Sequence, residues 1–129
     1  GARCAADLLA RHRELTALLC LNDRMAMGAI QQARLMGRHI PRDLTVTGYD
    51  GIPAAASFAP PLTTIDQGAP DIGQTAARML FDILEGATPD SLVVPVSLIH
   101  GETTARPCPV PDHDPASISP STRKEDPSP

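Results

Sequence analysis

The chain has 129 residues, of which 42% are hydrophobic, and this fits one small domain with a real core built largely from aliphatic side chains and alanine. Its formal net charge of -4 and its pI near 5.4 argue against direct binding to a nucleic-acid backbone, which requires clustered Lys and Arg. No apolar run approaches the ~20 residues that a membrane helix needs, so no contact with a membrane is expected.

The chain opens with alternating helix and strand patterns. Residues 2–13 carry one apolar side among Asp and Arg, which predicts a surface helix. The continuous apolar run 17–21 predicts a strand covered on both faces of a parallel sheet. Residues 23–36 predict a second helix, because their alanines and Ile30 form one stripe and Gly37 follows at the position of a left-handed cap.

Two further strands follow in the middle of the chain. The β-rich segment 44–49 ends at the turn pair Asp50-Gly51 and predicts the second strand. Residues 53–61 predict a loop or short helix that is closed by Pro60-Pro61. Residues 62–65 predict a third short strand.

The last predicted elements are a helix and a strand. Pro70 stands at a first helical position and Gly86 closes the pattern, so a helix is expected over residues 69–86. It has the strongest apolar stripe of the chain, which consists of Ile72, Ala76, Met79, Leu80 and Ile83. Residues 92–99 predict the last strand, and Pro95 places it at an edge or a bend.

Together these elements predict an α/β fold with a mostly parallel sheet. Residues 107–129 are rich in Pro and Ser, and a disordered tail is expected there. Residues 1–106 therefore form the structured part. The chain begins with Gly1 and with helical sequence, so we expect it to be a piece of a longer protein.

Polar side chains follow three of the predicted strands. Asn22 and Asp23 come after the first, Asp50 after the second and Gln67 after the third. The carboxyl ends of parallel strands meet at one edge of a sheet, where ligands bind. A carboxylate with amides suits a hydroxyl-rich ligand. The alternative is that Asn22 or Asp23 only caps the next helix and that Asp50 makes an Asx turn.

Catalytic and metal-binding patterns are missing from the sequence. There is no G-x-S-x-G, no H-E-x-x-H and no Gly-rich phosphate loop between a strand and a helix. The cysteines are odd in number, and neither they nor the histidines have the spacing of a metal site; these residues are Cys4, Cys20, Cys108, His12, His39, His100 and His113. We therefore expect no enzyme activity, no metal and no cofactor.

Four sequence motifs, in their order and spacing, resemble those of a known protein family over about Gly1 to Pro107. They read LNDRMAMGAIQQARLMGRHIPRDLTVTGYDGIP, then PPLTTIDQ, IGQTAARMLFDILEG and VPVSLIHGETTARP. This sequence resembles the LacI/GalR transcription regulators, specifically the carboxyl-terminal part of their effector-binding domain. The resemblance implies an incomplete parallel-sheet lobe of a periplasmic-binding-protein-like type I fold, and it assigns helix 69–86 to the other, missing lobe.

The resemblance also implies roles for individual residues. Asn22, Asp50 and Gln67 match ligand-contacting positions in the cleft between the lobes. Met27 and Phe58 match positions on a homodimer surface. From the helical pattern alone, Met27 lies off the core stripe and is either an isolated exposed residue or part of a partner surface.

The function implied for the parent protein is transcription regulation in the cytoplasm, most simply as a repressor. A small effector, such as a sugar, would bind between the lobes and change operator binding by an amino-terminal helix–turn–helix head that this chain lacks. A periplasmic sugar-binding protein of a transporter shares the fold and is the main alternative. A sugar-processing enzyme would need an acid and base pair that the sequence does not show.

Overall fold

The computed structural model describes residues 1–106, and the tail predicted at 107–129, with Cys108 and His113, lies outside the described residues. The helices and strands are α1 (Ala2–Arg11), β1 (Ala17–Leu19), α2 (Asp23–Leu35), β2 (Thr45–Thr47), α3 (Pro53–Ala56), β3 (Thr64–Asp66), α4 (Ala69–Leu84) and β4 (Ser97–Ile99). In this part of the chain, no helix has the length and apolar character needed to cross a membrane.

The strands form two two-stranded sheets, β1 with β2 and β3 with β4. β1 and β2 are parallel, with Leu18 opposite Val46. Two isolated parallel bridges, Thr47 to Thr63 and Asp50 to Asp66, continue the sheet from β2 to β3. β4 pairs with β3 in the antiparallel direction. The α/β fold with a mostly parallel sheet is therefore confirmed.

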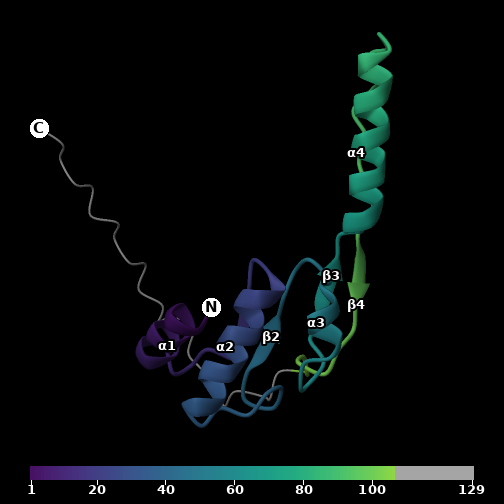
Figure 1. The fold of residues 1–129 in the computed structure, drawn as a ribbon. Coiled ribbons are helices and arrows are strands. Elements are labelled where there is room, and N and C mark those ends of the chain that lie inside the picture. The colour runs from purple at the N-terminus through teal and green to yellow at the C-terminus, as the bar shows by residue number, and fades with distance from the viewer. Residues whose placement is uncertain (107–129) are drawn as a thin grey trace, which may run out of the picture.

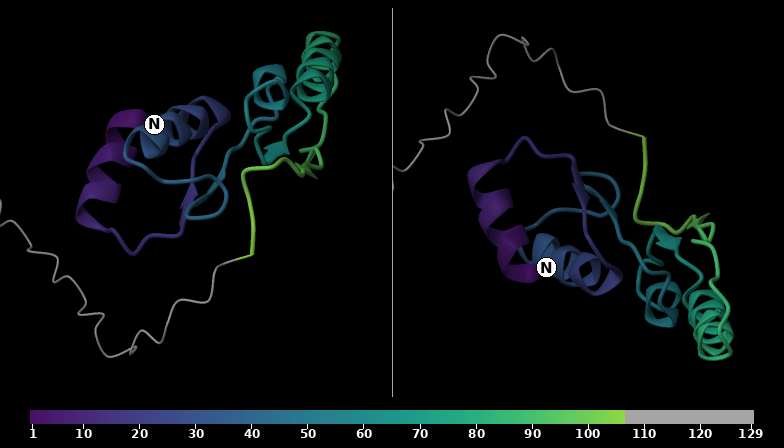
Figure 2. Two further views of the ribbon diagram at one scale, coloured as in Figure 1. Left: turned by 90° about the horizontal axis from the view of Figure 1, so that it is seen from below. Right: turned by 90° about the horizontal axis from the view of Figure 1, so that it is seen from above.

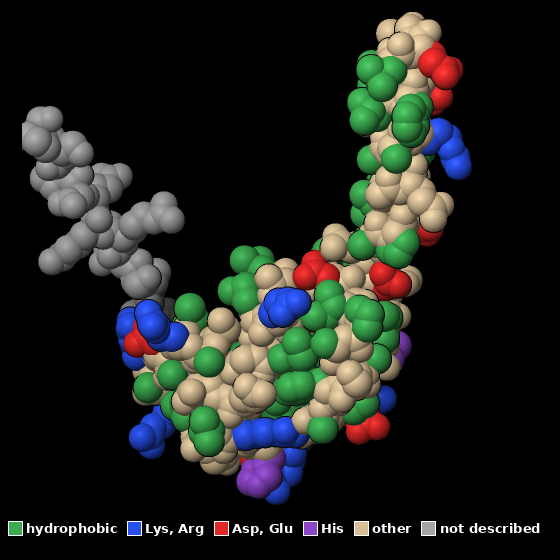
Figure 3. Space-filling view, in the orientation of Figure 1, with side chains coloured by type: hydrophobic (Ala, Val, Ile, Leu, Met, Phe, Trp, Pro, Cys, Tyr) green, Lys and Arg blue, Asp and Glu red, His purple; other side chains and the backbone are tan. Residues whose placement is uncertain are grey.

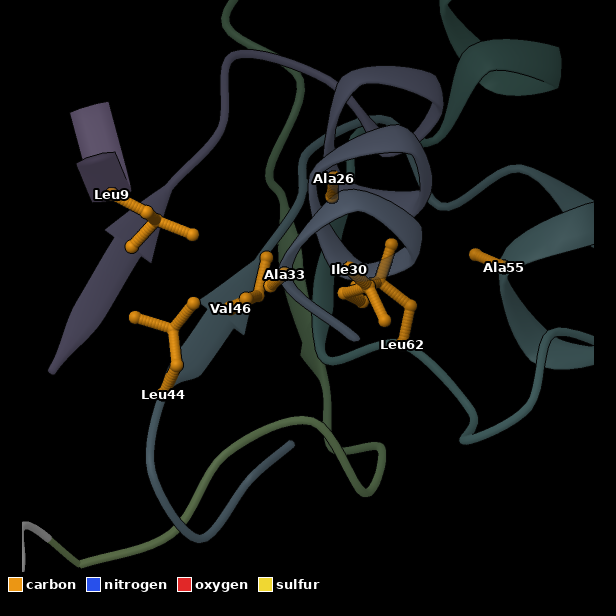
Figure 4. Close-up of a cluster of buried hydrophobic side chains, with 8 residues drawn as sticks. All are labelled: Leu9, Ala26, Ile30, Ala33, Leu44, Val46, Ala55 and Leu62. Atoms are coloured by element: carbon orange, nitrogen blue, oxygen red, sulfur yellow. The ribbon is translucent and has the colours of Figure 1, made fainter. Parts of the chain in front are cut away.

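The core lies between α2 and the sheet (Figure 4). α2 contributes Ala26, Ile30 and Ala33, all 0% exposed, as its apolar stripe predicted. They meet Val46 of β2 and Leu62 ahead of β3. α1 packs beside α2, and Figure 2 shows these two helices together at one end of the molecule. Aliphatic side chains and alanine supply this burial, as the composition required.

The opposite face of the sheet is open within residues 1–106. Leu19 is 84% exposed and Leu21 is 83% exposed. The prediction that residues 17–21 are covered on both faces is therefore wrong for this part of the chain, because no described element packs over that face. A hollow of about 350 Å³ lies there instead, lined by apolar residues that include Cys20, Ile65 and Leu98.

α4 stands away from the rest of the molecule (Figure 1). It contains no buried residue, and its hydrophobic side chains form a row along the helix (Figure 3). Leu80 is 56% exposed and Leu84 is 72% exposed. The predicted strand 92–99 is shorter than expected: β4 covers only Ser97–Ile99, and Val93 is 88% exposed. Pro95 has no N–H for a ladder, which fits a strand that starts after it.

The segment that follows β4 returns to the core and joins β2 to β3. The Thr103 side chain is 0% exposed. Its Oγ1 donates to the carbonyl oxygen of Val46 at 2.6 Å and accepts from the backbone N–H of Thr63 at 2.9 Å. The Glu102 N–H donates to the Pro61 carbonyl at 2.7 Å. No pattern in the sequence predicted that this segment would be hydrogen-bonded to the core.

Candidate functional site

The carboxyl ends of β1, β2 and β3 meet at one edge of the sheet. The N–H of Asp23, at the start of α2, donates to the carbonyl of Tyr49 at 2.8 Å. The N–H of Asp50 donates to the carbonyl of Ile65 at 2.9 Å. These bonds hold together the turns that carry the sequence-predicted site residues Asn22, Asp50 and Gln67.

Asn22 is the N-cap of α2. Its backbone is extended, and its Oδ1 accepts from the N–H of Met25 at 2.8 Å. Asn, Asp and Ser favour this position because they satisfy an N–H that has no partner within the helix. The cap expected from Asn22 or Asp23 is therefore made by Asn22. The cap uses only its oxygen, and the amide nitrogen makes no hydrogen bond within residues 1–106, so it can still donate to a ligand.

Asp50 and Gln67 are brought together by the fold. Gln67 Nε2 donates to Asp50 Oδ1 at 3.2 Å, and both side chains are half-buried. The Asx turn considered for Asp50 occurs instead at Asp66, whose Oδ1 accepts from the N–H of Gly68 at 2.8 Å. That turn leads directly into α4. Asp50 keeps its second carboxylate oxygen available at the edge of the sheet.

The surroundings of these residues limit what the edge can do. The hollow on the open sheet face contains Cys20 and Tyr49 but none of Asn22, Asp50 and Gln67, and it adjoins the polar edge at Thr64. Burial raises the pKa of the Cys20 thiol, which disfavours the reactive thiolate. The polar edge offers hydrogen-bond donors and acceptors from the side chains of Asn22, Asp50 and Gln67.

Met27 and Phe58 are both partly buried and pack against the hydrophobic core. Met27 is not among the buried residues of α2, so it lies on the flank of the core stripe and is not an isolated exposed residue. The guanidinium of Arg34 donates to the carbonyl of Ala59 at 2.7 Å and joins α2 to the segment after Phe58. Each of the two side chains still presents part of its surface outward, where a second copy of the protein can contact it.

The burial of Asp23 was not predicted from the sequence, which placed it at the strand ends or as a possible cap. The Asp23 side chain is 0% exposed and accepts hydrogen bonds from the Ile52 N–H and from the Thr64 hydroxyl. Its position between an apolar run and a helix was a usable signal. Nothing in the sequence marked Thr64 as its partner.

The fold and this edge define an α/β ligand-binding domain of the periplasmic-binding-protein type. The family described as "periplasmic binding protein-like domain" matches residues 1–104. The chain belongs to this family, in the branch formed by the effector-binding domains of LacI/GalR regulators. The resemblance seen in the motifs is thereby confirmed.

Two curated relatives illustrate this similarity. The chain is 38% identical over 111 residues to the HTH-type transcriptional regulator MalR of Streptomyces coelicolor, over 83% of this chain and 32% of that protein. It is 44% identical over 82 residues to the HTH-type transcriptional repressor PurR of Mannheimia succiniciproducens, over 64% of this chain and 25% of that protein. The chain thus spans about a third of the length of such relatives or less.

Solved structures show the same similarity. The lac repressor dimer bound to operator and the anti-inducer ONPF matches with a TM-score of 0.75 and 34% identity, over 80% of this chain and 36% of that one. A LacI family regulator from Arthrobacter in complex with lactose matches with a TM-score of 0.72 and 32% identity, over 81% of this chain and 41% of that one. The chain therefore covers only part of the fold.

Proposed function

We propose that this chain is the sensor part of a DNA-binding transcription regulator that acts as a repressor. A small, hydroxyl-rich effector binds between two lobes, one of which is only partly present here, and binding changes the affinity of a helix–turn–helix head for its operator. The head lies outside this chain, whose net charge of -4 is unsuited to a phosphate backbone. The regulator forms a homodimer, acts in the cytoplasm and has no enzymatic activity.

The pairing of Asp50 with Gln67 is the observation that carries this proposal. Gln67 Nε2 occupies Asp50 Oδ1, and the second carboxylate oxygen of Asp50 is available to accept a hydrogen bond from a ligand hydroxyl. Asn22 contributes its amide nitrogen from the start of α2. Sugars present such neighbouring hydroxyl groups, and one solved relative is in complex with lactose and another with cellobiose. We therefore assign Asn22, Asp50 and Gln67 to effector binding.

The dimer assignment rests on Met27 and Phe58. Each side chain is half-buried on the core and half available to a partner, and Arg34 fixes their two segments together. In a symmetric dimer the same patch would meet its own copy. Dimeric lac repressor structures match this chain with TM-scores of 0.75 and 0.78, which supports the same kind of assembly.

The proposal is tested with the full-length protein. Titration calorimetry against a panel of mono- and disaccharides, including lactose and cellobiose, measures effector binding, and DNA mobility with the promoter of its own operon measures the response. We expect at least one sugar to bind and to change DNA affinity without being chemically altered. Binding without any effect on DNA would favour a transport protein, and conversion of the sugar to a product would favour an enzyme.

A further inference from the structure

Asp23 is the one buried charged side chain among residues 1–106. Its Oδ2 accepts from the N–H of Ile52 at 2.8 Å, and its Oδ1 accepts from the Thr64 hydroxyl. The backbone of Gly48 passes directly beside Oδ1. One carboxylate therefore joins the start of α2, the turn after β2 and the first residue of β3.

Asp23 is not needed to start its helix. Asn22 already caps α2, and a carboxylate in the first helical turn gains its favourable interaction with the helix dipole while exposed to water. Burying a charge carries a large penalty unless hydrogen bonds offset it. A fully buried carboxylate at this position therefore indicates a structural role other than starting the helix.

The partners of Asp23 coincide with the proposed effector site. Asn22 is its neighbour in the chain, Asp50 lies midway between Gly48 and Ile52, and Gln67 lies three residues after Thr64. Each proposed effector-binding residue therefore lies next to Asp23 in the chain or on a segment that is hydrogen-bonded to Asp23. The Asp23 N–H makes a third hydrogen bond, to the carbonyl of Tyr49.

We propose that Asp23 is the positioning residue of the effector site: its buried carboxylate holds Asn22, Asp50 and Gln67 in one arrangement without contacting the effector. This inference rests on the proposed function, since it concerns the same site. Preorganised groups bind more tightly because the ordering of the segments is completed before the ligand arrives. Loss of the carboxylate's hydrogen bonds should therefore lower affinity even where the fold survives.

The test removes the Thr64 hydroxyl rather than Asp23 itself, so that the fold is disturbed as little as possible. Thr64→Val is nearly isosteric and leaves Asp23 Oδ1 without its donor, whereas Thr64→Ser keeps the hydroxyl. Val46→Ala, in the core of β2 and away from the edge, is the control for lost stability. Full-length proteins are titrated with lactose and with cellobiose, and the Tm of each variant is recorded.

We expect Thr64→Val to weaken sugar binding about tenfold. Thr64→Ser should bind as the wild type does, and Val46→Ala should also bind normally despite an equal or larger loss of Tm. The inference would be overturned if Thr64→Val lost no more sugar affinity than Val46→Ala does. The Asp23 carboxylate would then contribute to stability alone.

Amide hydrogen exchange separates this inference from the proposed function. If the wild type binds neither sugar, the assignment of a sugar effector fails, and exchange at the Asp50 and Ile52 amides still decides the role of Asp23. Faster exchange there in Thr64→Val, restored in Thr64→Ser and with α2 still protected, supports the positioning role. Unchanged exchange at both amides overturns it.

Discussion

Gln67 holds Asp50 by a hydrogen bond of 3.2 Å while the backbone of Asp50 has a φ of 118°. Asp50 is the one non-glycine residue with positive φ in the described part of the chain. Such a conformation costs on the order of 1–3 kcal/mol and persists where the surrounding structure imposes it, often at a ligand site. The bond from the Asp50 N–H to the Ile65 carbonyl, at 2.9 Å, is one of the contacts that impose it.

Asp50→Gly should separate binding from stability. Glycine adopts positive φ readily, so the free energy of unfolding should stay the same or rise by up to about 1 kcal/mol. Sugar binding should weaken by about 1.5 to 3 kcal/mol, because charge-assisted hydrogen bonds are lost. Titration and scanning calorimetry of the full-length protein measure the two effects.

Asp50→Ala serves as the matched control for this prediction. It removes the same carboxylate but keeps a β-carbon, and with it the strain at positive φ, so it should bind as weakly as Asp50→Gly and be less stable. DNA binding without effector should survive in both. A dissociation constant equal to that of the wild type in either variant would contradict the assignment of Asp50.

Gly48→Ala should destabilise the protein by about 1–3 kcal/mol, the usual cost of overpacking. A β-carbon on Gly48 would lie 2.2 Å from Asp23 Oδ1 and 2.9 Å from Leu62 Cδ2, so one of them must move. Gly73→Ala in α4 is the control, because a β-carbon there meets nothing within 4 Å in the described residues. It should raise helix stability by about 0.5–1 kcal/mol. Urea denaturation measures both, and equal stabilities would contradict the crowding at Asp23.

The order of the elements was predictable because it depends on local pattern. The stripe of α2, with Ile30 in its centre, and the glycine after it gave bounds close to those observed. The strands were harder. β4 is shorter than its apolar run, and Leu19 is exposed although it lies in a continuous apolar segment. An apolar run indicates that a strand can be buried. It does not indicate which other element covers the strand.

The site was predictable only in part. The rule that strand ends converge placed Asp50 and Gln67 together, and their hydrogen bond confirms that proximity. The links through Thr64 and Thr103 could not be read from the sequence, because both join residues about 40 or more positions apart. Such long-range hydrogen bonds depend on how the strands are aligned with one another, and this alignment cannot be read from a single sequence.

Met27→Asp should convert the full-length dimer to monomers. Met27 has one side against the core and the other available to a partner, so a charge there would have to be desolvated at the interface. Sedimentation measures the assembly, and circular dichroism checks that the helices persist, since the core contact is also disturbed. Met27→Leu, which keeps the apolar volume, should remain dimeric. A dimer that persists in Met27→Asp would count against the interface.

The 129-residue chain by itself should associate rather than behave as a stable two-state monomer. α4 contains no buried residue, and its stripe of Ile72, Met79, Leu80 and Ile83 has no described partner to cover it. Full burial of such side chains is worth about 1.5–3 kcal/mol each, so covering the exposed part of the stripe would add at most about 6–12 kcal/mol. This is comparable with the whole stability of a typical domain, about 5–15 kcal/mol.

Light scattering and scanning calorimetry on the purified chain test this expectation. Leu80→Lys should reduce the association, because it places a charge in the middle of the exposed stripe of α4. Gln74→Lys adds the same charge to the same helix at a position outside the stripe, and should leave the association as it is. A monomer with one sharp, reversible transition would show that residues 1–106 bury enough apolar surface to fold alone, and that α4 needs no partner to remain in water.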